Sequence, residues 1–206
     1  MRHFGASDLM HTLAEKRYRV FSGGKFDLNI VGVRSVNSKS NSFDDVLCVL
    51  YKDNFGQWVL EKFECTTDPG KHWLLNPLNK NGTLIMVPSQ TRGAYKIGVH
   101  GRTGRYPYEA LEQVKPMPYV RDNNKDTILN FDLIENKANW IRGVFKTNIH
   151  RASKWKTLLG IGKYSAGCQV IQSPQSFDRF MALCILQVKS GHGNSFTYTL
   201  INENDI

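Results

Sequence analysis

The sequence has no apolar stretch long enough to cross a membrane and no recognisable export signal. A transmembrane helix needs about 20 consecutive apolar residues, and no run approaches that length. The first twenty residues are polar and lack the apolar centre of a secretory signal. We therefore expect that the protein does not insert into a membrane and that it is made in the cytoplasm without a signal peptide. An extracytoplasmic substrate would then have to be reached by another route.

The four cysteines form no metal-binding or redox motif. None belongs to a CxxC pair, which disfavours a zinc ribbon or a thioredoxin-like site. Cys48 and Cys184 lie in strongly apolar segments and are expected to be buried core residues. Cys65 borders a polar turn and is harder to assign. Cys168 differs from all three, because it lies among small, flexible residues in the segment SAGCQ.

Close histidine spacings of hydrolytic metal sites are also missing. His72 and His100 could bind a metal together with Asp68 or Asp122, but no His-x-His or HExxH pattern occurs. Residues 121–126 resemble a calcium loop only faintly and are expected to form a turn. We expect neither a metal nor a cofactor.

The charge balance is basic but contains no long run of one sign. Lys and Arg number 27 against 18 Asp and Glu, for a net charge of +9. Such a balance favours solubility or an anionic partner: nucleic acid, anionic lipid or a bacterial cell wall. The basic residues look scattered, and no nucleic-acid-binding motif occurs. Nucleic acid is therefore not the expected partner and remains the weakest alternative.

Most of the chain is predicted to form β-strands. Runs rich in β-branched and aromatic residues predict strands over 26–35, 45–53, 57–65, 82–89, 93–100, 118–122, 127–134, 143–151, 168–173 and 195–202. Loops are expected over 66–82 and 152–167, and a loop leading into a helical turn over 100–113. Helical spacing predicts helices over 8–18 and 176–190. The expected fold is mainly β, a sandwich or barrel with a few helices, including one near the C-terminus.

One cysteine and one histidine lie at the predicted ends of two strands. His150 ends one strand, and Cys168 begins the next after a long loop. The loop can fold back and bring both side chains to one rim of the sheet. An imidazole there can take the thiol proton and return it to a leaving amine. Gly167 permits backbone conformations closed to other residues, and the N–H groups of Gly167 and Cys168 would face an oxyanion.

The segment NIHRASKWKTLLGIGKYSAGCQVI resembles the signature of the YkuD-type L,D-transpeptidase catalytic domain. In that family a histidine precedes a Ser/Thr-His-Gly-Cys element at about this distance. The resemblance implies that Cys168 is the nucleophile, His150 the general base, Ser165 the small hydroxyl residue and Gly167 the glycine. It covers about the last third of the chain. Papain-like and NlpC/P60-like peptidases place the cysteine first, so chain order argues against them.

The resemblance also implies a division of the chain and a set of substrate contacts. Residues 1–24 would form an N-terminal helical segment, and residues 25–206 an L,D-transpeptidase-like catalytic domain. Ala166 replaces the family's second histidine, so contacts to a substrate or oxyanion would come from other residues. The candidates are Arg151, Tyr164, Trp155 and Gln169. Arg151 is equally well explained as an ordinary surface arginine.

The whole chain is similar to a group of phage-encoded proteins that carry LNIVGVRS, FECTTDPG, GAYKIGVH, NIHRA and SAGCQV in this order. Together the two resemblances imply an enzyme that acts on peptidoglycan stem peptides through a Cys168 thioester. It would be an endolysin-like L,D-peptidase if water takes the acyl group and a transpeptidase if an amine does, acting on the cell wall after release. The alternative is a non-catalytic virion or wall-binding protein on a relic scaffold.

Overall fold

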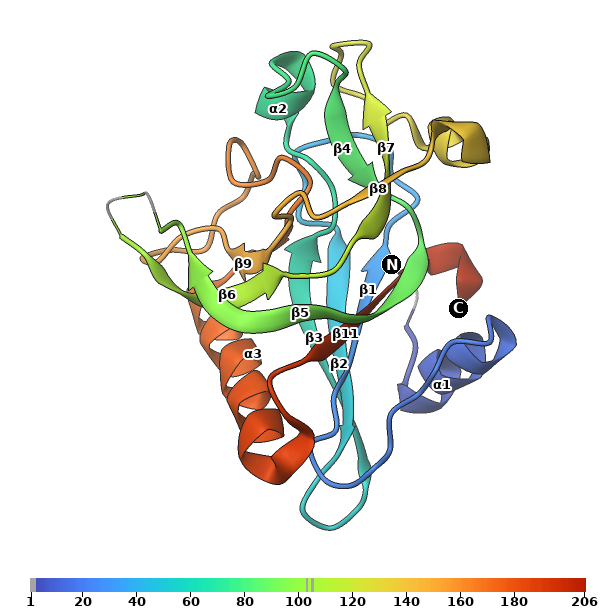
Figure 1. Cartoon of the computed structure of the whole chain (residues 1–206), viewed down its shortest axis with the longest axis vertical. Helices are drawn as coiled ribbons and strands as arrows, with labels where there is room; N and C mark the ends of the chain where they lie inside the picture. The colour runs from blue at the N-terminus through green and yellow to red at the C-terminus, as the bar shows by residue number, and fades with distance from the viewer. Residues whose placement is uncertain (1–2, 103, 105) are drawn as a thin grey trace.

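A computed structural model describes residues 3–102, 104 and 106–206. Its main feature is a closed eight-stranded β-barrel with strand order β1-β11-β5-β6-β9-β10-β3-β2 (Figure 1). The barrel strands are β1 (Asn29–Arg34), β2 (Asp45–Lys52), β3 (Trp58–Thr66), β5 (Ser89–His100), β6 (Tyr108–Gln113), β9 (Ile149–Arg151), β10 (Gln169–Ile171) and β11 (Phe196–Asn202). The mainly β prediction is confirmed, and the architecture is a barrel rather than a sandwich.

Two pairs of barrel strands are parallel. β1 pairs with β11, and β9 pairs with β10, while the other neighbours are antiparallel. Parallel neighbours require a crossover connection of about a dozen residues or more. The long segment between His150 and Cys168 is that crossover, so it returns the chain to the end of the sheet where β9 began.

A small second sheet covers one end of the barrel, at the top of Figure 1. Its strands are β4 (Thr83–Met86), β7 (Met117–Asp122) and β8 (Ile141–Gly143), in the order β4-β7-β8. Leu84, Met86, Met117 and Tyr119 from this sheet belong to the main core cluster. The alternating residues Ile85, Val87 and Val120 form a separate cluster with Leu74 and Leu129. The two faces of the sheet therefore pack against different parts of the chain.

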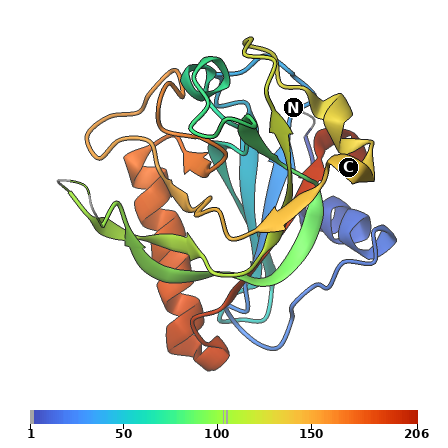
Figure 2. The ribbon, with the colours of Figure 1, turned by 45° about the horizontal axis from the view of Figure 1, so that its top comes forward.

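Helices α1 (Ala6–Glu15) and α3 (Pro174–Gln187) lie on opposite sides of the barrel (Figures 1 and 2). Leu9 and Leu13 of α1 pack on Val31 and Val33, which explains why β1 is apolar on both faces. The first helix begins at Ala6, two residues before the predicted start, and ends at Glu15 rather than at residue 18; Met1 and Arg2 of the segment 1–24 lie outside the described residues.

The C-terminal helix is confirmed. Ser173 caps α3 by accepting a hydrogen bond from the Ser176 backbone N–H, and Pro174 occupies its first turn. Phe177 and Phe180 are buried in the main core, and the helix packs against β3, β9 and β10. Because β9 and β10 carry the predicted catalytic pair, α3 supports those two strands from the core side.

Four local predictions are wrong. The helical turn predicted at the end of 100–113 is strand β6, because pairing with β5 from Gln113 to Tyr108 outweighs local helix propensity; Thr103 and Arg105 of that segment lie outside the described residues. The strand predicted over 127–134 is the 3₁₀ turn η1 (Phe131–Ile134), and the loop predicted over 66–82 contains helix α2 (Lys71–Leu75). Of the strand predicted over 143–151, only Gly143, which ends β8, and the three residues of β9 are in strands.

Candidate functional site

His150 is the middle residue of β9, and Cys168 directly precedes β10, the strand that pairs with β9. Val170 lies opposite His150 in the parallel register, and Gln169 lies opposite Ile149. Ile149 faces the main core, so the alternation along a strand directs His150 to the other face. Continued for one residue before the start of β10, the same alternation would place Cys168 on the face of His150. With a rise of about 3.3 Å per residue and a strand spacing of about 4.8 Å, the Cα atoms of a pair offset by two residues lie roughly 8 Å apart. Side chains of this size can meet across that distance.

The loop before Cys168 is held by Ser165. The buried Ser165 hydroxyl donates to the Cys168 carbonyl (2.8 Å) and accepts from the Gly167 backbone N–H (3.2 Å). Gly167 has φ of +117°, and a Cβ there would lie 2.9 Å from the Leu84 carbonyl oxygen. Glycine is therefore required at 167 for conformation and for space. The Gly167 N–H is already engaged, so the predicted oxyanion contact from it is not supported by this geometry.

His150 is held as a neutral base. Its Nδ1 lies 2.9 Å from the Arg151 carbonyl, which can only accept, so Nδ1 carries the proton and Nε2 carries the lone pair. Burial and, to a smaller extent, the nearby His100 lower the pKa of His150 to about 3, against a smaller rise from the Arg151 hydrogen bond. The imidazole is therefore uncharged near neutral pH and ready to accept a proton at Nε2.

Cys168 is held as a protonated thiol. Burial raises its pKa to about 11, and the Asn148 backbone opposes this rise. Its Sγ lies 3.8 Å from the Lys146 carbonyl, and within the described ranges no hydrogen bond joins Sγ to His150. Cys48, Cys65 and Cys184 are fully buried, as predicted for Cys48 and Cys184, which leaves Cys168 as the one partly exposed thiol of the described chain.

A second histidine stacks on His150. The His100 and His150 ring centroids are 4.1 Å apart at an interplanar angle of 17°. The Gln113 backbone N–H donates to Asn148 Oδ1, which fixes the orientation of that amide and turns its Nδ2 toward His100 Nδ1 (3.0 Å). A neutral His100 therefore keeps its proton on Nε2. In the stack, His150 can therefore accept a hydrogen bond at Nε2, and His100 can donate one from Nε2.

Buried hydrogen bonds brace the segment between β8 and β9. Gln113 Oε1 accepts from the Phe145 and Thr147 backbone N–H groups, at 2.9 Å and 3.1 Å. The Tyr95 hydroxyl contacts the Thr147 carbonyl (2.9 Å) and Gln169 Oε1 (2.6 Å), and Tyr95 is fully buried in the main core. The fully buried Gln169 points inward and also bonds the Gly167 carbonyl. Gln169 therefore supports the loop and does not take the position of the predicted substrate contact.

Two clefts open on either side of the pair. The first, which we call the cysteine cleft, has a volume of about 360 Å³ and is lined by Cys168, Ala166, Lys146, Phe145 and Arg121 among others. The second, the histidine cleft, has a volume of about 590 Å³. Beside the two stacked histidines, its lining includes three predicted residues, Arg151, Trp155 and Tyr164, and also Lys163. The predicted groove residues Trp155 and Tyr164 therefore lie together, on the histidine side.

Seven of the basic residues lie in one segment of the chain that contains no acidic residue. From Asn136 to Phe177 the chain contains no Asp or Glu, but seven basic residues: Lys137, Arg142, Lys146, Arg151, Lys154, Lys156 and Lys163. This acid-free segment forms β8, β9, β10 and part of the walls of both clefts. Lys146, Arg151, Lys154 and Lys163 of the segment line the two clefts, and a scan for missing acidic residues would have found the segment in the sequence.

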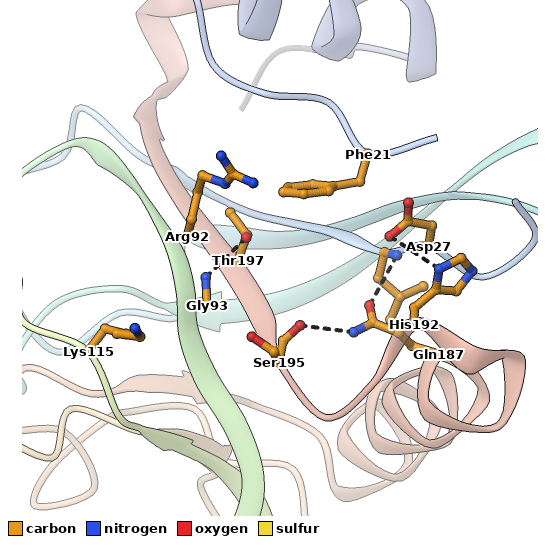
Figure 3. Close-up of a pocket in the computed structure, with 10 residues that line it drawn as sticks. Phe21, Asp27, Arg92, Gly93, Lys115, Gln187, His192, Ser195 and Thr197 are labelled. Carbon is orange, nitrogen blue, oxygen red and sulfur yellow. Dashed lines mark hydrogen bonds and ion pairs between the residues drawn. The ribbon is translucent and has the colours of Figure 1, made fainter. Parts of the chain in front are cut away.

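Other candidate residues lie elsewhere. Asp68 is buried and pairs with buried Arg34 (Nη2 to Oδ1, 2.9 Å), so it is structural and does not face a substrate. Across the described ranges no group of three or more His, Cys, Asp and Glu side chains could hold a metal ion. Likewise, no helix of the described chain is long and apolar enough to span a membrane. A third cleft of about 380 Å³, near Arg92, Lys115 and Phe21, shares no lining residue with the other two (Figure 3).

Comparisons with protein-family models, with curated proteins and with solved structures found no match to this chain. The functional argument therefore rests on the residues and their geometry.

Proposed function

We propose that the protein is a cysteine-dependent acyl-transfer enzyme of the L,D-transpeptidase kind, acting on peptidoglycan stem peptides. The observation that carries the proposal is that Cys168 directly precedes the strand that pairs in parallel with the strand of His150, whose Nε2 lone pair is available. The motif resemblance around these residues gives the reaction class. The phage resemblance points to release into the cell wall as the route to the substrate.

The proposed reaction begins with proton transfer from the Cys168 thiol to His150 Nε2. The sulfur attacks the carbonyl carbon of a peptide bond between an L-centre and a D-residue, and the tetrahedral intermediate collapses to a thioester. His150 gives its proton to the departing amine. Water or a second amine then attacks the thioester and restores the thiol. The low pKa of His150 makes its protonated form a strong acid, which favours the delivery of the proton to the amine.

Substrate charge supports this class of substrate. Stem peptides carry free carboxylates, and each cleft presents cationic side chains: Arg121 and Lys146 on the cysteine side, Arg151 and Lys163 on the histidine side. The Arg151 guanidinium lies 3.8 Å from the centre of the Tyr108 ring, so Arg151 is held at the cleft wall. Arg151 is therefore the better supported of the predicted substrate contacts.

A non-catalytic wall-binding protein is the second candidate, favoured by a specific observation. Burial shifts the two pKa values apart, to about 11 for Cys168 and about 3 for His150, so the neutral pair is strongly preferred over the thiolate and imidazolium. The thiol contacts the Lys146 carbonyl instead of the imidazole. Substrate binding would have to bring the two groups into contact for catalysis.

Thiol acylation separates the two candidates. The protein is incubated with a carbapenem, an electrophilic acyl donor, and its intact mass is measured. The enzyme predicts one adduct, lost in Cys168→Ala and strongly slowed in His150→Gln, because the other three cysteines are buried. Cys184→Ala is the matched control and should retain the adduct. Digestion of purified peptidoglycan by the same variants, analysed by mass spectrometry, then distinguishes hydrolysis from cross-linking. Full peptidoglycan activity in Cys168→Ala would refute the mechanism.

A further inference from the structure

The crossover between β9 and β10 carries two large apolar side chains that the protein leaves in solvent. Trp155 is 82% exposed and Leu159 is 94% exposed. Both lie in residues 153–160, which we call the crossover tip, and Figure 2 shows the crossover projecting from the side of the barrel. Single exposed apolar residues are common, but two on one projecting tip suggest a contact surface.

The charged residues that adjoin the crossover tip in the sequence are all basic. Lys154 and Lys156 flank Trp155, Lys163 follows in the same crossover, and the acid-free segment that contains them ends only at Phe177. The Lys154 Nζ lies 4.7 Å from the centre of the Trp155 ring. Tryptophan and leucine beside several lysines make the composition of a segment that lies at an anionic bilayer surface.

The crossover is anchored at Leu158 within the tip and at Gly162 and Lys163 just after it, so the tip is presented as a preformed element. The Leu158 carbonyl accepts from Gln172 Nε2 (2.6 Å), and the Gly162 backbone N–H donates to Asn41 Oδ1 (2.6 Å). The Trp73 indole N–H donates to the Lys163 carbonyl (3.0 Å). Preformed geometry reduces the ordering cost of binding a surface.

We propose that the crossover tip docks the protein on an anionic lipid bilayer, with Leu159 and Trp155 entering the headgroup–acyl boundary and Lys154 and Lys156 contacting lipid phosphates. The apolar exposure favours lipid over nucleic acid or a polyanionic wall polymer, because a fully exposed leucine gains nothing from phosphate groups in water. The histidine cleft, whose wall includes Trp155, would then open next to the membrane surface. This proposal does not depend on the proposed acyl-transfer activity.

Vesicle co-sedimentation tests the proposal. The protein is mixed with vesicles of phosphatidylcholine alone or of phosphatidylcholine with phosphatidylglycerol, at low salt. We expect binding to the anionic vesicles only, weakened about tenfold by Leu159→Ser through lost apolar burial. The Lys154→Ala and Lys156→Ala double variant should weaken binding about 25-fold, at about fivefold for each lysine.

The chain offers a matched control for the leucine. Phe55, 87% exposed, lies in the β2–β3 hairpin at the bottom of Figure 1, away from the crossover, and Phe55→Ser should not change vesicle binding. Circular dichroism spectra that match the wild type show that each variant is folded. The proposal is overturned if anionic vesicles bind every variant equally, if neutral vesicles bind as well as anionic ones, or if no vesicle binds. In the last case, retention on duplex DNA or on purified cell wall would assign the positive face to a polyanion instead.

Discussion

The positive φ of Gly167 makes a sharp prediction about the cysteine loop. An L-residue in this region of backbone space costs about 1–3 kcal/mol. A Cβ at 167 would also lie 2.9 Å from the Leu84 carbonyl oxygen and 3.0 Å from the Leu84 Cβ, so backbone must move. Overpacking of this kind costs about 1–3 kcal/mol more. We therefore expect Gly167→Ala to lower the free energy of unfolding by about 2–5 kcal/mol.

Gly162 separates the two contributions. It also has a positive φ, of +55°, but a Cβ there would meet nothing within 4 Å. Gly162→Ala should therefore cost only about 1–2 kcal/mol, from conformation alone. Urea denaturation of both variants measures the difference in their free energies of unfolding. In thermal denaturation, a chain of this size should show Tm values about 10 °C below the wild type for Gly167→Ala and about 4 °C below it for Gly162→Ala. Equal losses in the two variants would refute the role given to the contact between Gly167 and Leu84.

Three further predictions follow from buried groups. Asp68→Asn leaves the buried guanidinium of Arg34 without its carboxylate and should cost about 3–5 kcal/mol in urea denaturation; a loss below about 1 kcal/mol would mean that the pair behaves as a surface one. Tyr95→Phe removes the buried hydroxyl that donates to the Thr147 carbonyl or to Gln169 Oε1 beneath the cysteine loop and should cost about 1–3 kcal/mol, with no loss expected if water replaces the hydroxyl. Because the folded-state pKa of His150 is about 3 against an ordinary 6.5, the stability that depends on its neutral form is complete above about pH 6.5 and is lost as pH falls toward 3. The slope should be about 1.4 kcal/mol per pH unit and absent from His150→Gln, so parallel pH curves for the two proteins would contradict the shift.

Local patterns predicted the elements whose partners lie close in sequence. The strands predicted over 45–53 and 57–65 form the β2–β3 hairpin, and Gly56 between them has a positive φ. Helical spacing predicted α3 because its buried face repeats along one helix. Strand β6 was missed because the sequence YEALEQ has the propensity of a helix, and only its pairing with β5 across the intervening turn makes it a strand.

The candidate site was predictable only in part for a similar reason. His150 and Cys168 lie on strands joined by one crossover, so their order and spacing revealed the pair. His100 and Asn148 lie on different parts of the chain, and barrel closure brings them together. Nothing in the residues around His100 indicates that its ring stacks on His150. Burial of Gln169 was also hidden, because a polar residue beside a presumed nucleophile suggests a surface position until Tyr95 is seen to contact it.

The parallel pairing of the first and last barrel strands has a consequence for synthesis of the protein. β11 inserts between β1 and β5, so β1 has no neighbour on that side until residues 196–202 are available. On the ribosome, two sheet edges stay open until residues 196–202 have left the exit tunnel, and open edges are where strands from other chains add. Completion of the barrel is therefore a late, long-range event, and a stop codon before Phe196 would release a chain with both edges exposed to aggregation.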